Sequence, residues 1–269
     1  MVTDKILRSP LGPVFGELRD SMQIRLTDVA VVSFPKSGRT WLRVMLAASL
    51  NKHYGCTDQE ILDPRALRDL CPSVPRIVFT HDRANLRVGL EGNFRRFRSK
   101  DVIFLVRDPL DVVVSYYFQR TRRQLEKHPS IEEFARSPKF GIRRVVDFMN
   151  DWYAQAPVFR SFLLLRYEDL VACPVPELDR TLKFLGVEPT REVVEETIRT
   201  YTFERMRSLE RQRRHRWLAP GDERDPESYK VRRGKIGGFA DYLNEATCRE
   251  MREIIDSELH PDLGYVFSV

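Results

Sequence analysis

A short segment near the N-terminus combines two basic residues, two hydroxyl residues and one glycine directly after the apolar run 29–34. It reads Pro35-Lys-Ser-Gly-Arg-Thr-Trp41, and a stretch with the apolar spacing of a helix follows. A strand, a tight turn and a helix N-terminus bring backbone N–H groups together, and the helix dipole favours an anion there. We therefore expect a phosphate-binding loop in which Lys36 adds charge and Ser37 and Thr40 add hydroxyl donors.

The P-loop of nucleoside triphosphatases, G-x-x-x-x-G-K-[ST], is the natural comparison for this segment. Gly38-Arg39-Thr40 resembles the end of that motif, but Arg39 stands at its lysine position and Ser33 at its first glycine position. These two departures fall on positions with a mechanistic role, and they disfavour an ATP or GTP hydrolase.

A second group of polar residues follows the apolar run 101–107. Arg107 ends the run, Asp108-Pro109 closes it, and Ser115 lies eight residues after the arginine on a predicted helix. Arg107 and Ser115 could reach one phosphate, which an arginine grips with two parallel hydrogen bonds. Two other interpretations stay open: Asp108 could hold magnesium, or Asp108 or Asp111 could cap the helix.

Together the two segments resemble the signatures of the cytosolic-type sulfotransferases. The first resembles their YPKSGTTW phosphosulfate loop, with Phe34 for the tyrosine and Arg39 for the first threonine. The second resembles their strand-end arginine followed eight residues later by a serine, which Arg107 and Ser115 match. The resemblance implies that the donor is 3'-phosphoadenosine 5'-phosphosulfate (PAPS), with 3'-phosphoadenosine 5'-phosphate (PAP) as its product.

Two further segments occur in the order that this family shows. Pro75-Arg-Ile-Val-Phe-Thr-His81 resembles the strand that ends Lys-Thr-His, with Phe79 in place of the lysine, so the resemblance implies that His81 is the general base. Tyr167-Glu-Asp169 resembles the family's Tyr-Glu-Asp segment, whose tyrosine lies beside the adenine.

The C-terminal third contains two more partial matches. Val231-Arg-Arg-Gly-Lys-Ile-Gly-Gly-Phe239 resembles the pattern R-K-G-x-x-G-D-W, with a match at Arg232, Arg233 and Gly234 and departures at Gly238 and Phe239. Tyr201-Thr-Phe-Glu-Arg-Met206 resembles the Thr-Ser-Phe segment beside the adenine. There Thr202 and Phe203 match, whereas Tyr201 does not.

The resemblance assigns each matched residue a role. His81 takes the acceptor's proton, and Lys36 with the backbone of 37–40 stabilises charge on the bridging oxygen and the 5'-phosphate. The 3'-phosphate is bound by Arg107, Ser115, Arg232 and Arg233, and the adenine stacks against Trp41, Tyr167 and Phe203. No metal is expected, because lysine and arginine already neutralise the phosphates.

Apolar runs alternate with helical patterns along most of the chain. Strands are expected over 29–34, 76–80, 101–107 and 161–167, and helices over 40–50, 111–124, 141–155, 175–185, 190–200, 203–212 and 242–259, with a loop over 213–229. Such alternation predicts a single α/β domain with a central, mostly parallel sheet flanked by helices on both faces. We expect residues 1–25 to form a loosely ordered lead-in and residues 26–269 to form the sulfotransferase domain, which contains the P-loop-like phosphosulfate loop.

The composition indicates a soluble globular protein. Of 269 residues, 42% are apolar and 31% are charged, with 45 Lys and Arg against 39 Asp and Glu, and the net charge of +6 favours anionic ligands. No apolar run is long enough to span a membrane, and the N-terminus lacks a secretory h-region. The four cysteines are far apart and fit reduced thiols, so we expect a cytoplasmic protein.

Two other function classes stay open on the sequence alone. A P-loop-type nucleotide kinase would use ATP and magnesium, with Asp108 as a ligand. A nucleic-acid-binding module would use the arginine-rich stretches, but no helix-turn-helix, zinc or aromatic-basic signature accompanies them, so no nucleic-acid partner is expected. The acceptor could be a small molecule, a lipid or a carbohydrate, and a homodimer is possible.

Overall fold

The computed structural model describes residues 24–82, 94–215 and 217–266. Four strands form one sheet in the order β2-β1-β3-β4, and every neighbouring pair is parallel. The strands are β1 (Val29–Ser33), β2 (Ile77–Thr80), β3 (Asp101–Val106) and β4 (Ser161–Arg166). The predicted parallel α/β sheet is thus confirmed, with each strand within one residue of its expected bounds.

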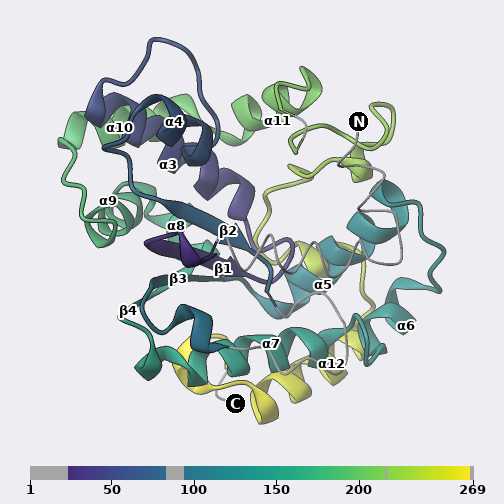
Figure 1. The fold of residues 1–269 in the computed structure, drawn as a ribbon. Helices are drawn as coiled ribbons and strands as arrows, with labels where there is room; N and C mark the ends of the chain where they lie inside the picture. The colour runs from purple at the N-terminus through teal and green to yellow at the C-terminus, as the bar shows by residue number, and fades with distance from the viewer. Residues whose placement is uncertain (1–23, 83–93, 216, 267–269) are drawn as a thin grey trace, which may run out of the picture.

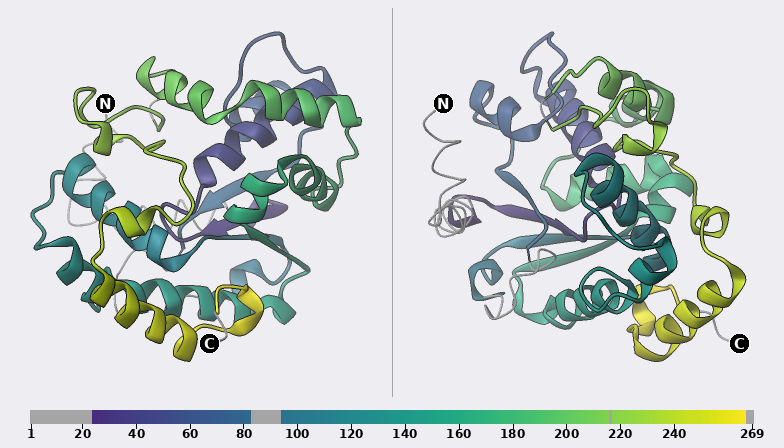
Figure 2. Two further views of the ribbon diagram at one scale, coloured as in Figure 1. Left: turned by 180° about the vertical axis from the view of Figure 1, so that it is seen from behind. Right: turned by 90° about the vertical axis from the view of Figure 1, so that its right-hand side faces the viewer.

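Helices cover both faces of this sheet, because the strands are apolar on both sides (Figures 1 and 2). Along β3, Ile103 and Leu105 enter one core, while Val102, Phe104 and Val106 enter the other. The first core contains residues of α3 (Arg39–Tyr54), α4 (Pro64–Leu70), α8 (Tyr167–Ala172), α9 (Pro174–Phe184), α10 (Arg191–Thr200) and α11 (Phe203–Arg211). The second contains residues of α5 (Pro109–Phe118), α6 (Ile131–Arg136), α7 (Ile142–Ala154) and α12 (Glu245–Glu258).

The strand order creates a switch point between β1 and β3. From β1 the chain continues to β2 on one side of it, whereas from β3 it continues to β4 on the other side. The connections after these two central strands therefore diverge and leave a crevice at the strands' carboxyl ends. Both predicted phosphate-binding segments, 34–41 and 107–115, begin at this crevice.

Several helix boundaries differ from the expectation for local reasons. The α3 helix extends to Tyr54, where Gly55 adopts a left-handed conformation, and α12 begins only after its cap Asn244. The helix expected over 111–124 is instead α5 followed by a π-helical turn, Gln119–Arg123. The short helices α4, α6 and α8 were not expected, although Ser130 and Glu133 form a capping box before α6 that has a sequence signature.

The remaining regular segments are short 3₁₀ turns: Phe94–Phe97, Ala156–Val158, Pro226–Ser228, Gly238–Asp241 and Pro261–Leu263. The expected loop over 213–229 has only one of these turns among its described residues. Residues 1–23 of the expected lead-in lie outside the described residues, whereas Ile24 is buried in the core. In the part of the chain that the structure describes, no helix has the length and apolarity needed to cross a membrane.

Candidate active site

The loop between β1 and α3 has the backbone geometry of an anion-binding turn. Lys36 has a φ of 75° and Gly38 a φ of 92°, so two residues of this turn lie in the left-handed region. A non-glycine residue there is uncommon, and such outliers concentrate at functional sites. Alternating backbone conformations of this kind turn successive N–H groups toward one point, where they attract an anion.

The N-terminus of α3 lacks a side-chain cap. Gly38 occupies the cap position without a capping hydrogen bond, and the first turn contains no acidic residue. The α5 helix is different, because the Asp108 side chain accepts hydrogen bonds from Leu110 N and Asp111 N. Of these two helix ends beside the crevice, only that of α3 has its first N–H groups available to an anion.

Gly38 also permits a close contact with Tyr167, the first residue of α8. A Cβ atom at position 38 would lie 2.4 Å from Cδ2 of Tyr167, closer than two carbon atoms can approach. The guanidinium carbon of Arg107 lies 4.6 Å from the centre of the same ring, and the Trp41 ring meets it edge-on at 6.4 Å. Tyr167 therefore contacts residues from both predicted phosphate-binding segments.

His81 follows β2 directly and is positioned by the sheet register. Because Val32 pairs with Thr80, the next residues, Ser33 and His81, lie opposite each other. His81 Nδ1 lies 2.8 Å from the Ser33 carbonyl oxygen, which can only accept, so Nδ1 carries the proton and Nε2 keeps its lone pair. Burial, reinforced by the charge of Arg39, holds the pKa of His81 well below its usual range. A neutral imidazole with a basic nitrogen is the result.

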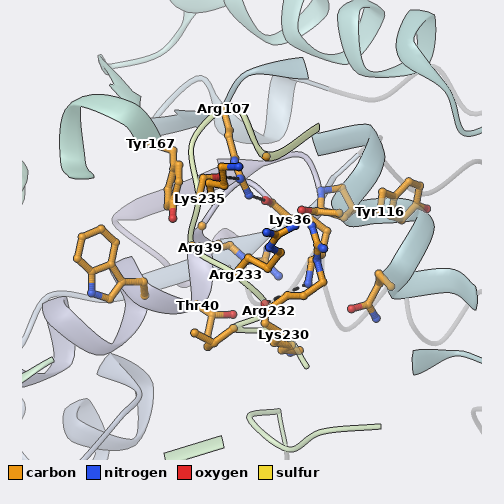
Figure 3. A pocket seen from close by; sticks show the side chains of 18 of the residues that line it. Lys36, Arg39, Thr40, Arg107, Tyr116, Tyr167, Lys230, Arg232, Arg233 and Lys235 are labelled. Carbon is orange, nitrogen blue, oxygen red and sulfur yellow. Dashed lines mark hydrogen bonds between the residues drawn. The ribbon is translucent and has the colours of Figure 1, made fainter. Parts of the chain in front are cut away.

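Arg107 occupies the tip of β3, where one carboxylate holds it. Its guanidinium donates to Asp111 Oδ2 at 3.1 Å, to the Lys235 carbonyl at 3.1 Å and to the Lys36 carbonyl at 3.3 Å (Figure 3). Asp111 is only 2% exposed, and it also accepts from Gly237 N and Phe239 N, each at 3.0 Å. Arg107 is thus fixed between the phosphosulfate loop and the C-terminal basic segment.

A second buried carboxylate holds the other end of this basic segment, residues 230–239. Glu210 is fully buried and accepts from Lys230 N at 2.7 Å and Val231 N at 2.8 Å. Arg123 lies 3.5 Å from the same carboxylate. Glu210 at the start and Asp111 near the end therefore fix the basic segment across the crevice.

The matched residues within the basic segment differ in their environment. Gly234 has a φ of 63°, and a Cβ there would lie 2.6 Å from Phe203, so the segment contacts the start of α11. Arg232 is largely buried, and it is paired with Glu227 at 2.7 Å. Arg233 is more exposed and is paired with Asp241 at 2.8 Å.

These segments enclose a cavity of about 500 Å³ at the carboxyl ends of β1, β2 and β3. Thirteen of the predicted site residues line it: Lys36, Gly38, Arg39, Thr40, Trp41, His81, Arg107, Ser115, Tyr167, Phe203, Arg232, Arg233 and Gly234. Figure 3 shows side chains of the phosphosulfate loop and of the basic segment gathered around one space. The sequence order of the motifs therefore corresponds to a single site.

Two predicted side chains are not part of the cavity wall. The Ser37 hydroxyl is buried and donates to the Phe34 carbonyl at 3.0 Å, which leaves only the backbone of Ser37 for a ligand. The Thr202 side chain caps α11 by accepting from Arg205 N at 3.3 Å. Its position after a helix break and before Glu204 is typical of a capping residue.

Sequence reasoning missed eleven residues of the wall: Pro35, Tyr116, Gln119, Arg120, Gln124, Val171, Met206, Lys230, Val231, Lys235 and Gly238. The glutamines and Arg120 belong to or follow the π-helical turn after α5, a feature without a recognised sequence signal. Lys230 is the first residue of the basic segment but lies before the matched motif 231–239, and only the fold shows that it faces the cavity.

The cavity wall is strongly cationic. It contains eight basic side chains and no carboxylate: Lys36, Arg39, Arg107, Arg120, Lys230, Arg232, Arg233 and Lys235. Burial and the charge of Lys230 lower the pKa of Lys36 to about 7. Burial and the neighbouring arginines, Arg123 foremost, lower that of Lys230 to about 8. Such a wall favours a ligand with several negative charges.

Three buried guanidinium nitrogens in this wall point to the same conclusion. Nη1 of Arg39, Nε of Arg107 and Nε of Arg232 make no hydrogen bond with any described residue. Buried polar groups are normally paired, and an unpaired donor is costly. Phosphate oxygens would satisfy the Nε donors of Arg107 and Arg232, so the residues present fit a polyphosphorylated nucleotide.

Comparison with known proteins identifies the family. The family model described as sulfotransferase domain matches residues 26–262, which is most of the chain. The chain belongs to the sulfotransferase family. It is a PAPS-dependent sulfotransferase, in agreement with the expectation from the two phosphate-binding segments.

Curated relatives of this sulfotransferase include enzymes with small-molecule acceptors in their names. Flavonol 3-sulfotransferase from Flaveria bidentis is 25% identical over 260 residues, covering 86% of this chain and 81% of the relative. The 3-beta-hydroxysteroid sulfotransferase from Cavia porcellus is 24% identical over 264 residues, covering 90% and 87%.

Solved structures show the same fold. Mouse sulfotransferase SULT7A1 complexed with PAP has a TM-score of 0.64 at 20% identity, covering 86% of this chain and 83% of that chain. Retinol dehydratase in a complex with retinol and PAP has a TM-score of 0.62 at 21% identity, covering 90% and 87%.

The kinase alternative for this sulfotransferase is wrong, as the family shows. The structure adds a physical reason, because Asp108 caps α5 and is absent from the cavity wall. Among the described residues, no cluster of three His, Cys, Asp or Glu could hold a metal ion.

Proposed function

We propose that the cavity binds PAPS and that His81 is the general base for sulfuryl transfer to a hydroxyl or amine of a small acceptor. The observation that supports this most directly is His81 itself. Its Nδ1 is fixed on Ser33, so that Nε2 is the nitrogen available in a wall that also contains eight basic side chains. The low pKa of His81 keeps this nitrogen unprotonated at neutral pH.

In the proposed step the acceptor oxygen attacks sulfur while its proton moves to His81 Nε2. A new oxygen–sulfur bond forms, and the bond between sulfur and the bridging oxygen of the 5'-phosphosulfate breaks. The electron pair of that bond stays on the 5'-phosphate of PAP, where Lys36 and the backbone N–H groups of 37–40 stabilise it. Thr40 adds a hydroxyl donor at the same end.

The 3'-phosphate is the group that distinguishes PAPS from ATP. We assign its binding to Arg107, Ser115, Arg232 and Arg233, with the Gly234 backbone allowing the segment to approach closely. The unpaired Nε atoms of Arg107 and Arg232 support this assignment. Arg233 is paired with Asp241 and must release that exposed carboxylate in part to reach a phosphate.

The adenine is assigned to the aromatic side of the cavity. Trp41, Tyr167 and Phe203 line it from three different elements, and Trp41 Nε1 is fixed by the Tyr201 carbonyl at 2.8 Å. Thr202 contributes by capping α11 and so fixing Phe203. Aromatic faces near a purine supply stacking energy without demanding a specific charge.

The finer properties of the protein follow from the family and remain part of the proposal. We place the enzyme in the cytoplasm, as the names of related cytosolic sulfotransferases from Arabidopsis thaliana suggest. We assign the sulfotransferase domain to 26–269 with 1–25 as a lead-in. The proposed acceptors include lipids and carbohydrates, and the proposed oligomeric state is a homodimer.

The test combines transfer with binding. Purified protein is incubated with ³⁵S-labelled PAPS and a panel of phenols, alcohols, amines and sugars, and PAP binding is measured by calorimetry beside ATP. We expect label transfer, tight PAP binding and weak ATP binding. His81→Ala should nearly abolish transfer and leave PAP binding unchanged, whereas the exposed His53→Ala serves as a matched control. Normal turnover of His81→Ala would remove the base role, and absence of PAP binding would remove the donor assignment.

A further inference from the structure

Four of the eight basic residues of the cavity wall are not used by the proposed donor contacts, and two of these four, Arg120 and Lys235, are paired with Glu126 and Asp241. The proposed donor contacts use Lys36, Arg107, Arg232 and Arg233, whereas Arg39 and Lys230 have no assigned side-chain partner. Both line the cavity together with His81. Their charges also lower the pKa of His81, so they lie on the same side of the cavity as the base.

Neither charge is neutralised by a carboxylate in the described part of the chain. Nη1 of Arg39 is buried and unpaired. The carboxylate nearest to Lys230, Glu210, already accepts from the backbone N–H groups of Lys230 and Val231 and faces Arg123. No ion pair of the Lys230 ammonium is found, and the ammonium lies 6.0 Å from the centre of the Trp217 ring.

A neighbouring arginine has the counter-ion that Arg39 and Lys230 lack, although its own Nε is also buried without a hydrogen bond. Arg43 lies 3.7 Å from the carboxylate of Asp63, and its guanidinium carbon is 4.4 Å from the ring centre of Phe79 and 4.9 Å from that of Trp217. Its charge therefore has both a counter-ion and two aromatic faces. Among the residues that the structure describes, Arg39, one turn earlier on α3, has neither.

Holding unpaired cations in a partly buried wall is unfavourable unless a ligand compensates them. We propose that Arg39 and Lys230 form a subsite for a negatively charged group on the acceptor, so that the enzyme sulfates a hydroxyl compound bearing a carboxylate, phosphate or sulfate ester. This inference rests on the proposed function, because it assumes that the nucleotide occupies the other cations. Burial, which lowers the pKa of Lys230 to about 8, adds a further reason for a counter-ion.

The experiment compares acceptors that share a scaffold and carry either an anionic or a neutral substituent. One set has a phenol scaffold: 4-hydroxybenzoate and 4-hydroxyphenyl phosphate against 4-hydroxybenzamide. The other has a sugar scaffold: glucuronate and glucose 6-phosphate against glucose. Transfer from labelled PAPS and calorimetric binding to the PAP-saturated enzyme are both measured. On at least one scaffold, we expect kcat/KM for the anionic acceptor to exceed that for the neutral acceptor by tenfold or more. Comparison of the carboxylate with the phosphate ester on that scaffold then shows which anion is preferred.

Variants connect this preference to the two residues. Lys230→Met should reduce kcat/KM for the anionic acceptor by about tenfold, the effect of losing one charge-assisted contact, with little change for the neutral one. Lys230→Arg should retain the preference, and Lys183→Met on the exposed side of α9 should have no effect. Arg39→Thr, which introduces the family's own residue, should also weaken the preference, with a thermal unfolding curve to verify folding.

Two results distinguish a failure of the proposed function from a failure of the acceptor subsite. Failure to bind PAP would contradict the proposed function and the subsite together. If PAP binds normally but the anionic and neutral acceptors have equal kcat/KM values and equal affinities, the subsite alone would be overturned. An equal loss for both partners in Lys230→Met would also overturn it.

Discussion

The carboxylate of Asp111 lies 3.1 Å from the guanidinium of Arg107, and the same carboxylate accepts the backbone N–H groups of Gly237 and Phe239. One buried side chain therefore connects the tip of β3 to a segment more than a hundred residues later in the chain. Because Arg107 in turn donates to the Lys36 carbonyl, the phosphosulfate loop is part of the same network.

The first prediction concerns this carboxylate. Asp111→Asn removes the charge that pairs with Arg107 and replaces one acceptor oxygen by a donor that would face N–H groups. Breaking a buried pair costs about 3–5 kcal/mol, so we expect a clear loss of unfolding free energy and PAP binding weaker by about tenfold or more. Chemical denaturation and calorimetry measure these two effects.

The control for this variant is Asp179→Asn on α9. Asp179 forms only an exposed pair with Lys183, and such pairs contribute about 0–1 kcal/mol. Equal behaviour of the two variants would show that Asp111 does not organise the site.

The second prediction concerns recognition of the 3'-phosphate. Arg107→Ala should weaken PAP far more than adenosine 5'-phosphate, which lacks that group, by about tenfold to a hundredfold for a lost charge-assisted bond. Arg107→Lys should recover only part of the difference, since lysine keeps the charge but cannot form two parallel bonds. Calorimetry with both nucleotides measures the ratio, and equal losses would mean that Arg107 does not contact the 3'-phosphate.

The third prediction uses two glycines with positive φ. Gly38→Ala and Gly55→Ala both force alanine into the left-handed region, which costs about 1–2 kcal/mol. Only at Gly38 would the new Cβ also collide with Tyr167, whereas nothing lies within 4 Å of it at Gly55. We expect Gly38→Ala to reduce PAP affinity by at least tenfold and Gly55→Ala to leave it unchanged. A comparable loss in both would show that strain alone, and not the tyrosine contact, matters.

The fourth prediction concerns pH. The pKa of Lys36 is about 7 in the free protein, and a bound phosphate would raise it by stabilising the ammonium. The complex then binds more protons than the free enzyme above pH 7, so PAP affinity should fall as pH rises from 7 toward 10. Calorimetry in buffers of different ionisation enthalpy should detect proton uptake near pH 8. Lys36→Met should abolish that proton uptake. If the variant takes up the same number of protons, the uptake belongs to another group.

The architecture and most of the site were accessible from the sequence because they depend on local patterns. Continuous apolar runs predicted the parallel strands, and motifs following those runs could only meet at the sheet's carboxyl edge. The register that sets His81 against Ser33 was not predictable, but the position of His81 at a strand end was.

The long-range partners could not be predicted in this way. Glu210 and Asp111 are carboxylates on helices, a pattern typical of solvated faces, and only tertiary packing makes them acceptors for a distant backbone. Lys230 lies directly before the matched motif 231–239, but the motif itself assigns it no role. The hydroxyl of Ser37 was assigned to the ligand side because the motif contains it, yet local geometry commits it to the Phe34 carbonyl.

The position of the basic segment along the chain has a consequence for biosynthesis. The last strand of the sheet ends at Arg166, but seven residues of the cavity wall come from the basic segment, residues 230–239. During synthesis the sheet can therefore be complete while the cavity still lacks this part of its wall. Nucleotide in the surrounding solution can stabilise the finished molecule by mass action, yet it offers no such help to the nascent chain.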